Sequence, residues 1–314
     1  MTTIGNKLLL AALDEYVTGH EKAKRALIVM LSRSVLRAYQ KYIKIMEDEY
    51  LVSPMKVLLL GPSGTGKSYL LKCLQKASIF PMVKIDATQL NPTGASGGIK
   101  VKELQEMICN SARVAMMDYP YSFNSLQEAI DRTVVHIDEF DKIGSNFESS
   151  GNWNKHVQSN FLTMFDNKDE YSGVSYVFTG AFSHLQQETI KNSIGFTTKK
   201  GEVEAQDAID TRIIRSGLIP EIIGRVNAIV ELDRFTKNDL FLILKDRILP
   251  KKQMDLAAYG VFGAKMSKKH MDKVASDALK SGQGVRYLQR AVDDFFLDLE
   301  FDAGDYLVTR ENYE

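Results

Sequence analysis

The sequence predicts an α/β fold, in which a parallel sheet is flanked by helices and followed by a small helical domain. Short apolar runs alternate with segments of helical periodicity, and this alternation is typical of a parallel sheet. Four strands are expected, at 57–60, 82–85, 134–137 and 174–179. After about Leu232, helical patterns follow one another without further strands. We therefore expect a large α/β domain at 1–232 and a small helical domain at 233–314.

A long helix is expected before the first strand. Thr18 and Glu21 have the spacing of a capping box, in which each side chain bonds the backbone N–H of the other residue. Apolar residues then recur from Ala23 to Ile45 at the spacing of one helix face. Together these signals predict one long helix over this stretch.

Three helices are expected in the small domain. Thr236 and Asp239 predict the start of the first, and Pro250 predicts its end. Ser267 predicts the start of the second helix, and Gly284 precedes the third. The residues expected to face inward are Met271, Val274, Ala278 and Leu279 in the second helix, and Leu288, Val292, Phe295 and Leu299 in the third.

Composition restricts the partners and the compartment. The 314 residues include 40 basic and 40 acidic side chains, so the net charge does not attract the chain to nucleic acid or to a membrane surface. The two cysteines, Cys73 and Cys109, offer neither a disulfide framework nor zinc-ligand spacing, which favours a reducing compartment. Apolar stretches are too short for a membrane span or a secretory signal. We expect a cytoplasmic protein.

A phosphate-binding loop follows the first predicted strand. Residues 61–68 read GPSGTGKS, which fits the pattern G-x-x-x-x-G-K-[ST]. In such a loop, backbone N–H groups surround the phosphates of ATP, the lysine reaches the β and γ oxygens, and the final hydroxyl binds Mg²⁺. A glycine turn with a stray lysine is the weaker interpretation, because a strand precedes the pattern and a helical segment follows it. The predicted ligands are Gly61, Pro62, Ser63, Gly64, Thr65, Gly66, Lys67 and Ser68.

Two carboxylates follow the third predicted strand. Asp138 and Glu139 would stand at the carboxyl edge of the sheet, where open α/β sheets bind ligands. We expect Asp138 to hold Mg²⁺ through its water shell and Glu139 to polarise the water that attacks the γ-phosphate. A solvated strand end would show the same pattern, but the position after a phosphate-binding loop favours the catalytic interpretation.

With these motifs the chain resembles the AAA+ ATPases, and within them the ClpX unfoldase family, with HslU next. The similarity runs almost end to end and implies a P-loop AAA+ module with a C-terminal helical lid. It also implies ATP hydrolysis in a ring, usually of six subunits. The segments that carry it, in family order, are YVTGHEKAKRAL at 16–27, VKIDATQL at 83–90, VVHIDEFDKI at 134–143, YVFTGAF at 176–182, GLIPEIIGRV at 217–226 and GVRYLQR at 284–290.

The resemblance assigns roles to further residues. Val17 and Thr18 would lie at the adenine, and Thr179 would be sensor 1, which bonds the attacking water or the γ-phosphate. Arg225 would be the arginine finger, which reaches into the nucleotide site of a neighbouring subunit. Arg286 would be sensor 2, which connects the helical domain to the phosphates. Without the surrounding motifs, either arginine would be taken for an ordinary surface side chain.

Departures from the ClpX pattern bear on function. We expect the zinc-binding domain that precedes the AAA+ module in ClpX to be missing, and substrates to be delivered differently. The pore loop reads Gly94-Ala95-Ser96-Gly97 where ClpX has Gly-Tyr-Val-Gly, and an alanine offers a passing polypeptide far less contact than an aromatic ring. The second pore segment, at 166–173, is short and lacks the basic loop of ClpX.

Two other segments concern partners. Ile194-Gly195-Phe196 stands where ClpX has the loop that docks on the ClpP peptidase. An apolar tip on a polar loop favours a partner, although packing on its own domain and contact with some other partner remain open. An insertion at 118–131 carries Tyr119, Tyr121 and Phe123, which form either a contact surface or a local packing cluster.

Two classes of function remain open. The first is a protein-remodelling motor, a homo-oligomeric ring that unfolds protein clients and could feed a ClpP-type peptidase. The second is a nucleotide-driven switch or assembly factor that regulates a partner without threading it. The altered pore loop favours the switch, and the Ile-Gly-Phe loop favours the motor. A nucleic-acid motor ranks third, because no basic stripe or series of stacking aromatics is present.

Overall fold

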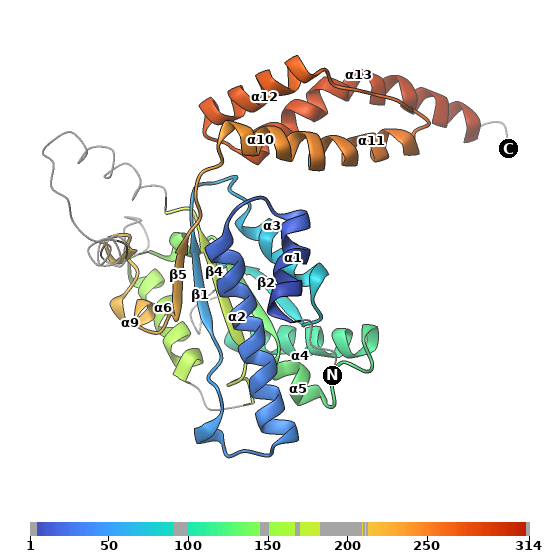
Figure 1. The fold of residues 1–314 in the computed structure, drawn as a ribbon. Helices are drawn as coiled ribbons and strands as arrows, with labels where there is room; N and C mark the ends of the chain where they lie inside the picture. Colours follow the sequence, from blue (N-terminus) through green and yellow to red (C-terminus); the bar gives the residue numbers. More distant parts are fainter. Residues whose placement is uncertain are drawn as a thin grey trace, which may run out of the picture. The chain divides into compact units, whose positions relative to one another are not determined.

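The computed structural model describes residues 5–90, 100–144, 151–166, 170–182, 209, 211 and 213–311. The chain forms two compact units. The first comprises Met1–Pro62 and Lys67–Leu232, and the second comprises Ser63–Gly66 and Asp233–Glu314. Figure 1 traces the elements of each unit along the chain.

The first unit is built on a sheet of five parallel strands, which confirms the predicted α/β class. The strands are β1 (Lys56–Leu60), β2 (Met82–Asp86), β3 (Val134–Asp138), β4 (Ser175–Gly180) and β5 (Ala228–Glu231). Their order in space is β2-β3-β4-β1-β5, and every neighbouring pair is parallel. The strand β5 was not expected. It is only four residues long and half-buried at the sheet edge, so it lacks the long apolar run that marks a central strand.

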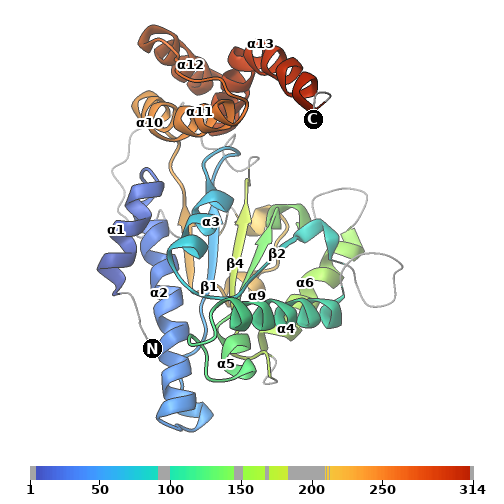
Figure 2. The same cartoon turned by 90° about the vertical axis from the view of Figure 1, so that its right-hand side faces the viewer.

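Helices cover both faces of this sheet (Figures 1 and 2). One face, which includes Val57 and Leu59, packs against α1 (Asn6–Tyr16), α2 (Glu21–Ala38) and α3 (Lys67–Ala77). The opposite face, which includes Leu58 and Phe178, packs against α4 (Val101–Asp118), α5 (Leu126–Asp131), α6 (Gly151–Asp166) and α9 (Pro220–Ile223). Because successive strand residues point to opposite faces, each strand supplies both cores.

The entry into α2 differs from the predicted capping box. His20 is the N-cap residue, with a left-handed φ of 60° and no side-chain cap, and Gly19 is also left-handed at 70°. These two residues turn the chain after Thr18, so the helix starts too late for Thr18 to cap it. Glu21 instead pairs with Lys24 at 3.2 Å. The helix ends at Ala38, earlier than expected, and a π-helical turn follows at Tyr39–Ile43. The helix α1, which precedes α2, was not expected.

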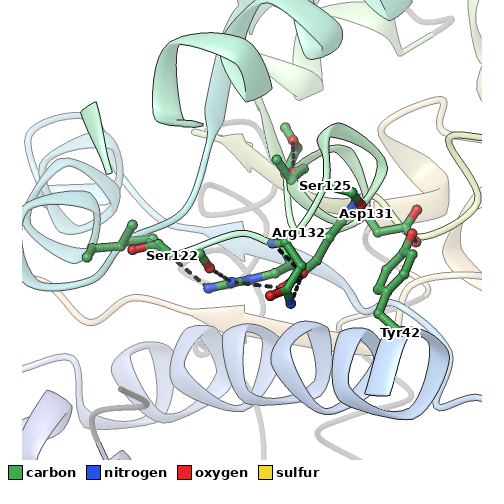
Figure 3. Close-up of polar contacts among 10 residues, drawn as sticks. Tyr42, Ser122, Ser125, Asp131 and Arg132 are labelled. Atoms are coloured by element: carbon green, nitrogen blue, oxygen red, sulfur yellow. Dashed lines mark hydrogen bonds and ion pairs between the residues drawn. The ribbon is translucent and has the colours of Figure 1, made fainter. Parts of the chain in front are cut away.

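The segment at 118–131 divides between packing and exposure. Phe123 is buried, and the Arg132 guanidinium lies 4.6 Å from the centre of its ring. Arg132 also donates to the carbonyl oxygen of Ser122 at 2.8 Å, as Figure 3 shows. In contrast, Tyr119 is about half exposed, and the side chain of Tyr121 is 98% exposed. The predicted packing cluster is therefore correct for Phe123 and wrong for the two tyrosines.

A buried carboxylate connects this segment to the turn after α2. Asp131 Oδ2 accepts hydrogen bonds from Tyr42 Oη at 2.7 Å and from Lys41 Nζ at 2.9 Å (Figure 3 shows Tyr42 and Asp131). Burial, followed by the hydrogen bond to Asp131, raises the pKa of Tyr42 above its ordinary value. The π-helical turn of Tyr39–Ile43 thus presents two consecutive side chains to one buried acceptor.

The second unit consists mainly of helices. They are α10 (Lys237–Ile243), a π-helical turn (Leu244–Ile248), α11 (Leu249–Ala258), α12 (Lys268–Ser281) and α13 (Val285–Glu311). Thr236 and Asp239 mark the start of α10 as predicted, where they form a capping box, and Ser267 caps α12. The prediction that Pro250 ends a helix is wrong. Pro250 lies in the first turn of α11, where its missing N–H removes no helical hydrogen bond.

The predicted inner faces of the last two helices are partly wrong. Val274, Ala278, Leu288 and Val292 are buried as expected, and Met271 packs against the same core. Leu279, Phe295 and Leu299 are exposed, whereas Phe296 is buried. These helices carry apolar residues on more than one face, so sequence spacing alone does not determine which face is covered. In the parts of the chain that are described, no helix is long and apolar enough to cross a membrane.

Candidate active site

The predicted phosphate-binding loop joins β1 to α3. The helix α3 begins at Lys67, within the GPSGTGKS segment. Three glycines of the loop have positive φ values: 150° at Gly61, 81° at Gly64 and 87° at Gly66. A side chain would strain the backbone at such angles, which explains why glycine occupies these positions. The loop therefore has the backbone geometry that a curl of N–H groups around phosphates requires.

The lysine of the loop lies beside the loop's own backbone. Lys67 Nζ donates hydrogen bonds to the carbonyl oxygens of Gly61, at 2.6 Å, and Pro62, at 2.9 Å. These bonds hold the ammonium group at the carboxyl end of β1. A fixed positive charge at this position suits the oxygens of a polyphosphate.

Asp138, the last residue of β3, is the centre of a polar network. Its Oδ2 accepts from Ser68 Oγ at 2.9 Å and pairs with Lys84 Nζ at 2.9 Å. Its Oδ1 accepts from Thr179 Oγ1 at 2.7 Å and from the Glu139 N–H at 3.1 Å. Burial by itself raises the pKa of Asp138, but the hydrogen bonds from Lys84, Thr179 and Ser68 outweigh burial and lower it. Asp138 is therefore ionised at neutral pH.

Strand register explains how these side chains meet. Lys84 of β2 pairs with His136 of β3, which in turn pairs with Val177 of β4. Residues two apart on a strand share a face, so Asp138 and Thr179 lie on the same face as these three. That face packs against α3, which begins with Lys67 and Ser68. The network thus combines two neighbouring strand ends, an edge strand and the start of one helix.

His136 extends the network into the core. Its side chain is fully buried, and Nε2 lies 2.9 Å from Thr179 Oγ1. Burial, together with nearby Lys84, lowers the pKa of His136 to about 4 despite the opposing effect of Asp138. The neutral ring carries one N–H. Because the Thr179 hydroxyl gives its hydrogen to Asp138, Nε2 must be the nitrogen that donates to Thr179.

Glu139 follows the strand with an unusual backbone conformation. Its φ is 54°, in the left-handed region that residues other than glycine seldom adopt. This conformation breaks the strand alternation directly after Asp138, and the Glu139 side chain is exposed. Backbone outliers of this type cluster at functional sites, where the surrounding structure holds them in place.

Comparison with known proteins identifies the family. The model of the ATPase family associated with various cellular activities (AAA) matches residues 57–216. The chain belongs to this AAA family. It is a ClpX-like AAA+ ATPase, an enzyme that hydrolyses ATP. The match spans the phosphate-binding loop, both carboxylates of the Asp-Glu pair and Thr179.

Two curated relatives show the ClpX likeness. One is the ATP-dependent Clp protease ATP-binding subunit ClpX 2 of Wolinella succinogenes, 28% identical over 321 residues, covering 92% of this chain and 75% of the relative. Another is the ATP-dependent Clp protease ATP-binding subunit ClpX of Treponema denticola, 29% identical over 337 residues, covering 93% of this chain and 75% of the relative.

The remaining predicted site residues of this AAA+ ATPase lie on other elements. Arg225 follows α9, is half-buried, and donates from Nη1 to the Glu221 carbonyl oxygen at 3.1 Å. Val17 is buried against α2 and α3, and Thr18 is half-buried beside it. Arg286 is the second residue of α13. Within the second unit, its Nη1 donates to Ser63 Oγ at 2.6 Å.

The structure thus brings Ser68, Asp138 and Thr179 into one hydrogen-bonded group, and places Arg225, Val17 and Arg286 on separate elements. The segments 94–97, predicted as a pore loop, and 194–196, predicted to dock on a peptidase, lie outside the described residues.

Two residues of the network, Lys84 and His136, were not predicted. Each is a polar residue that interrupts an apolar strand, in VKID and VVHID. For His136, which lies on an inner strand, that interruption was an available signal, because a buried polar side chain needs a partner. Lys84 lies on the edge strand β2 and is half exposed, so its position gave a weaker signal. The sequence alone does not reveal that Lys84 pairs with Asp138 or that His136 bonds Thr179.

Proposed function

We propose that this chain binds Mg-ATP at the carboxyl edge of its sheet and uses ATP hydrolysis, within a ring of identical subunits, to unfold or remodel protein clients. The observation that carries the proposal is the 2.9 Å hydrogen bond between Ser68 Oγ and Asp138 Oδ2. It joins the last residue of the phosphate-binding loop to the carboxylate at the end of β3. These two side chains must lie together to hold a metal bound to a triphosphate.

The donor set fits Mg²⁺. The Ser68 hydroxyl would supply an oxygen ligand of the kind that a small hard cation prefers, and the Asp138 carboxylate would accept hydrogen bonds from water molecules in the shell of the ion. In the described residues, no three His, Cys, Asp or Glu side chains gather into a metal site. That agrees with Mg²⁺, which is usually held by one or two carboxylates, water and substrate phosphates. When bound beside Ser68 and Asp138, Mg²⁺ would neutralise charge on the phosphate oxygens.

The loop from Gly61 to Ser68 would hold the phosphates. The positive φ values of its glycines support a cradle of backbone N–H groups, and the N-terminus of α3 adds the positive end of the helix dipole. Lys67 would add its charge to the β- and γ-phosphates. Val17 and Thr18, just after α1, would contact the adenine, an assignment that rests on the resemblance to ClpX.

Glu139 would act as the general base. Its exposed carboxylate directly follows Asp138, so the two acids can have separate roles, one toward the metal and one toward water. Thr179 would orient the attacking water or the γ-phosphate as sensor 1. The bond from His136 and the bond to Asp138 both hold the Thr179 hydroxyl, so its position would be pre-organised before ATP binds.

Arg225 and Arg286 would couple hydrolysis to movement. A finger arginine from a neighbouring subunit stabilises charge on the transferring phosphoryl group. Arg225 suits this role because it follows a short helix and is partly exposed. Arg286, as sensor 2, would respond to the nucleotide from the helical unit, and its hydrogen bond to Ser63 supports that assignment. A ring of six subunits is the arrangement that the resemblance favours.

Partners follow from the relatives. Both are described as ATP-binding subunits of a Clp protease, so we propose a ClpP-type peptidase as partner, docked through Ile194-Gly195-Phe196. We also infer a cytoplasmic location, because Cys73 and Cys109 are free thiols, as expected in a reducing compartment.

The second candidate is a nucleotide-driven switch that does not thread its partner. The specific observation in its favour is Ala95 in the pore loop sequence Gly94-Ala95-Ser96-Gly97. An aromatic ring in that position would offer a rigid contact surface to a moving chain, and a methyl group offers little.

An unfolding assay separates the two candidates. Purified protein is mixed with ATP, Mg²⁺ and a tagged fluorescent client, with and without ClpP, and loss of client fluorescence is followed. ATP-dependent loss that the variant Glu139→Gln abolishes would support remodelling. ATP hydrolysis without unfolding across a panel of clients would reject remodelling and favour the switch.

A further inference from the structure

Lys84 is a second cation at the centre of the candidate metal site. It lies on β2, an edge strand, and its Nζ is 2.9 Å from Asp138 Oδ2. That oxygen is the one that also accepts from Ser68 Oγ. The Lys84 side chain is 52% exposed, whereas the Asp138 side chain is 21% exposed.

The hydrogen bonds of Asp138 leave no acceptor position open. An ionised carboxylate offers about four lone-pair sites. Ser68 and Lys84 take those on Oδ2, and Thr179 and the Glu139 N–H take those on Oδ1. A water molecule in the shell of a bound Mg²⁺ can donate to Asp138 only if one of these donors leaves.

Lys84 is the donor that can leave most easily. Thr179 is fully buried and held by His136, and the Glu139 N–H belongs to the backbone. Ser68 is fixed by α3, and its hydroxyl can still donate to Asp138 while its oxygen binds a metal. The ammonium group of Lys84 sits on a flexible, half-exposed stem that can swing into solvent.

We propose that Lys84 competes with Mg²⁺ for Asp138 and thereby raises the Mg²⁺ concentration that nucleotide binding requires. The proposal rests on the proposed function, because it places Mg²⁺ at Ser68 and Asp138. Before the metal binds, the ammonium group neutralises the carboxylate. When the metal binds, the ammonium group must give up this contact and remains near another cation, which is unfavourable by Coulomb's law. Lys84 thus couples occupation of the site to the magnesium level.

The size of the effect follows from the exposure of the pair. Exposed ion pairs are worth about 0.2–1 kcal/mol, which corresponds to roughly a 1.4- to 5-fold change in an equilibrium constant. Replacing Lys84 with a neutral residue should therefore strengthen the coupling between Mg²⁺ and nucleotide by about 1.4- to 5-fold.

The test measures this coupling without hydrolysis. The affinity of the full chain for a fluorescent ADP analogue is measured with saturating Mg²⁺ and with EDTA, and the ratio of the two affinities is the coupling. The ratio removes any general effect of lost positive charge on nucleotide binding. We expect Lys84→Met to raise the ratio about 1.4- to 5-fold. Lys84→Gln should raise it equally, and it provides the measurement if the methionine variant does not fold.

Two control variants make the result specific. Lys84→Arg keeps the charge and should leave the ratio at or below that of the unmodified protein, since arginine pairs well with carboxylates. Lys76→Met removes an exposed lysine from the last turn of α3 and should leave the ratio unchanged.

Several outcomes would overturn the proposal. An unchanged or smaller ratio in Lys84→Met and Lys84→Gln would mean that Lys84 only neutralises Asp138. An equal rise in Lys76→Met would show a long-range effect of net charge. If the unmodified protein binds no ADP analogue with Mg²⁺ present, the proposed function fails, and this proposal fails with it.

Discussion

Asp138, Thr179 and His136 form a chain of hydrogen bonds that runs from the sheet edge into the core. The chain fixes one tautomer of His136 and one orientation of the Thr179 hydroxyl, because each group has a single hydrogen to donate. A buried polar network of this kind stabilises one arrangement when all of its members are satisfied. The site is therefore supported by a residue that would touch neither nucleotide nor metal.

The low pKa of His136 leads to a prediction about acid stability. The folded-state pKa of about 4 lies below the ordinary value of 6.5, so unfolding takes up a proton between these values. The contribution of the neutral His136 ring to the free energy of unfolding is fully present above about pH 6.5 and is lost as the pH falls toward 4. We expect this loss to be on the order of 3 kcal/mol.

Chemical denaturation at several pH values would measure this effect, with His136→Asn as the reference, because asparagine does not titrate. The free energy of unfolding of the unmodified protein should fall more steeply between pH 6.5 and 4 than that of the variant. Parallel profiles would contradict a buried neutral histidine.

At the level of single residues, the sequence predicted the parts of the site that a motif defines. Ser68 and Asp138 were predicted from their spacing to neighbouring motif residues, and the structure places them 2.9 Å apart. Lys84 and His136 belong to no motif. Their roles depend on strand register and on which strands are neighbours, which a single sequence does not specify.

Among the elements, the π-helical turn Tyr39–Ile43 joins two parts of the first unit that are distant in sequence. Tyr42 and Lys41 reach Asp131, about ninety residues along the chain. We expect Tyr42→Phe to lower the free energy of unfolding by about 1.5–3 kcal/mol, because a hydrogen bond to a buried charge is lost.

Tyr39→Phe provides the matched control. Tyr39 is the first residue of the same turn, but its side chain is exposed. Denaturation of both variants with urea would compare them. Equal stability of the two variants would mean that the bond between Tyr42 and Asp131 contributes little.

The predictions of strands and helices were correct or wrong for identifiable physical reasons. The strands β1, β3 and β4 were predicted because inner strands, which are covered on both faces, are mostly apolar. The edge strand β2 was predicted from Met82, Val83 and Ile85, although Lys84 between them is exposed. β5 and α1 were not predicted. β5 is a short edge strand, and the start of α1 at Gly5 carries no side-chain cap that would mark it in the sequence. Pro250 and the Thr18 capping signal were misread, because such local signals have several compatible geometries.

For the whole molecule, the proposal requires that one subunit complete the site of the next. If Arg225 acts across an interface, Arg225→Ala should lower the turnover number on the order of 10³-fold without loss of nucleotide binding. A subunit that lacks the catalytic base, Glu139→Gln, and a subunit that lacks the arginine finger, Arg225→Ala, should then restore ATPase activity when they are mixed.

Mixing the variants tests this prediction. In an equimolar mixture of Arg225→Ala and Glu139→Gln subunits, about a quarter of the interfaces join an intact Glu139 to an intact Arg225. ATPase activity should rise well above that of either variant alone. A mixture that is no more active than its components, under conditions where both assemble, would place Arg225 outside the neighbouring site.

The ring, the protein client and the peptidase partner depend on other molecules, and the residues of one chain do not specify them. The resemblance to ClpX led to the expectation of a ring, a client and a peptidase, but the pore-loop sequence at 94–97 departs from the ClpX pattern. Those properties depend on surfaces between chains. Residues at such surfaces are not needed for one chain to fold, so the patterns that predict the fold do not reveal them.

In the proposed function, Glu139 activates water for hydrolysis of an ATP held beside Ser68 and Asp138. The most direct test measures ATP binding and steady-state ATP turnover for Glu139→Gln, with Glu106→Gln, an exposed glutamate of α4, as the control for lost charge. We predict that Glu139→Gln binds Mg-ATP with the affinity of the unmodified protein and turns it over about 10²- to 10⁴-fold more slowly, while Glu106→Gln is unaffected. Undiminished turnover in Glu139→Gln would contradict the account.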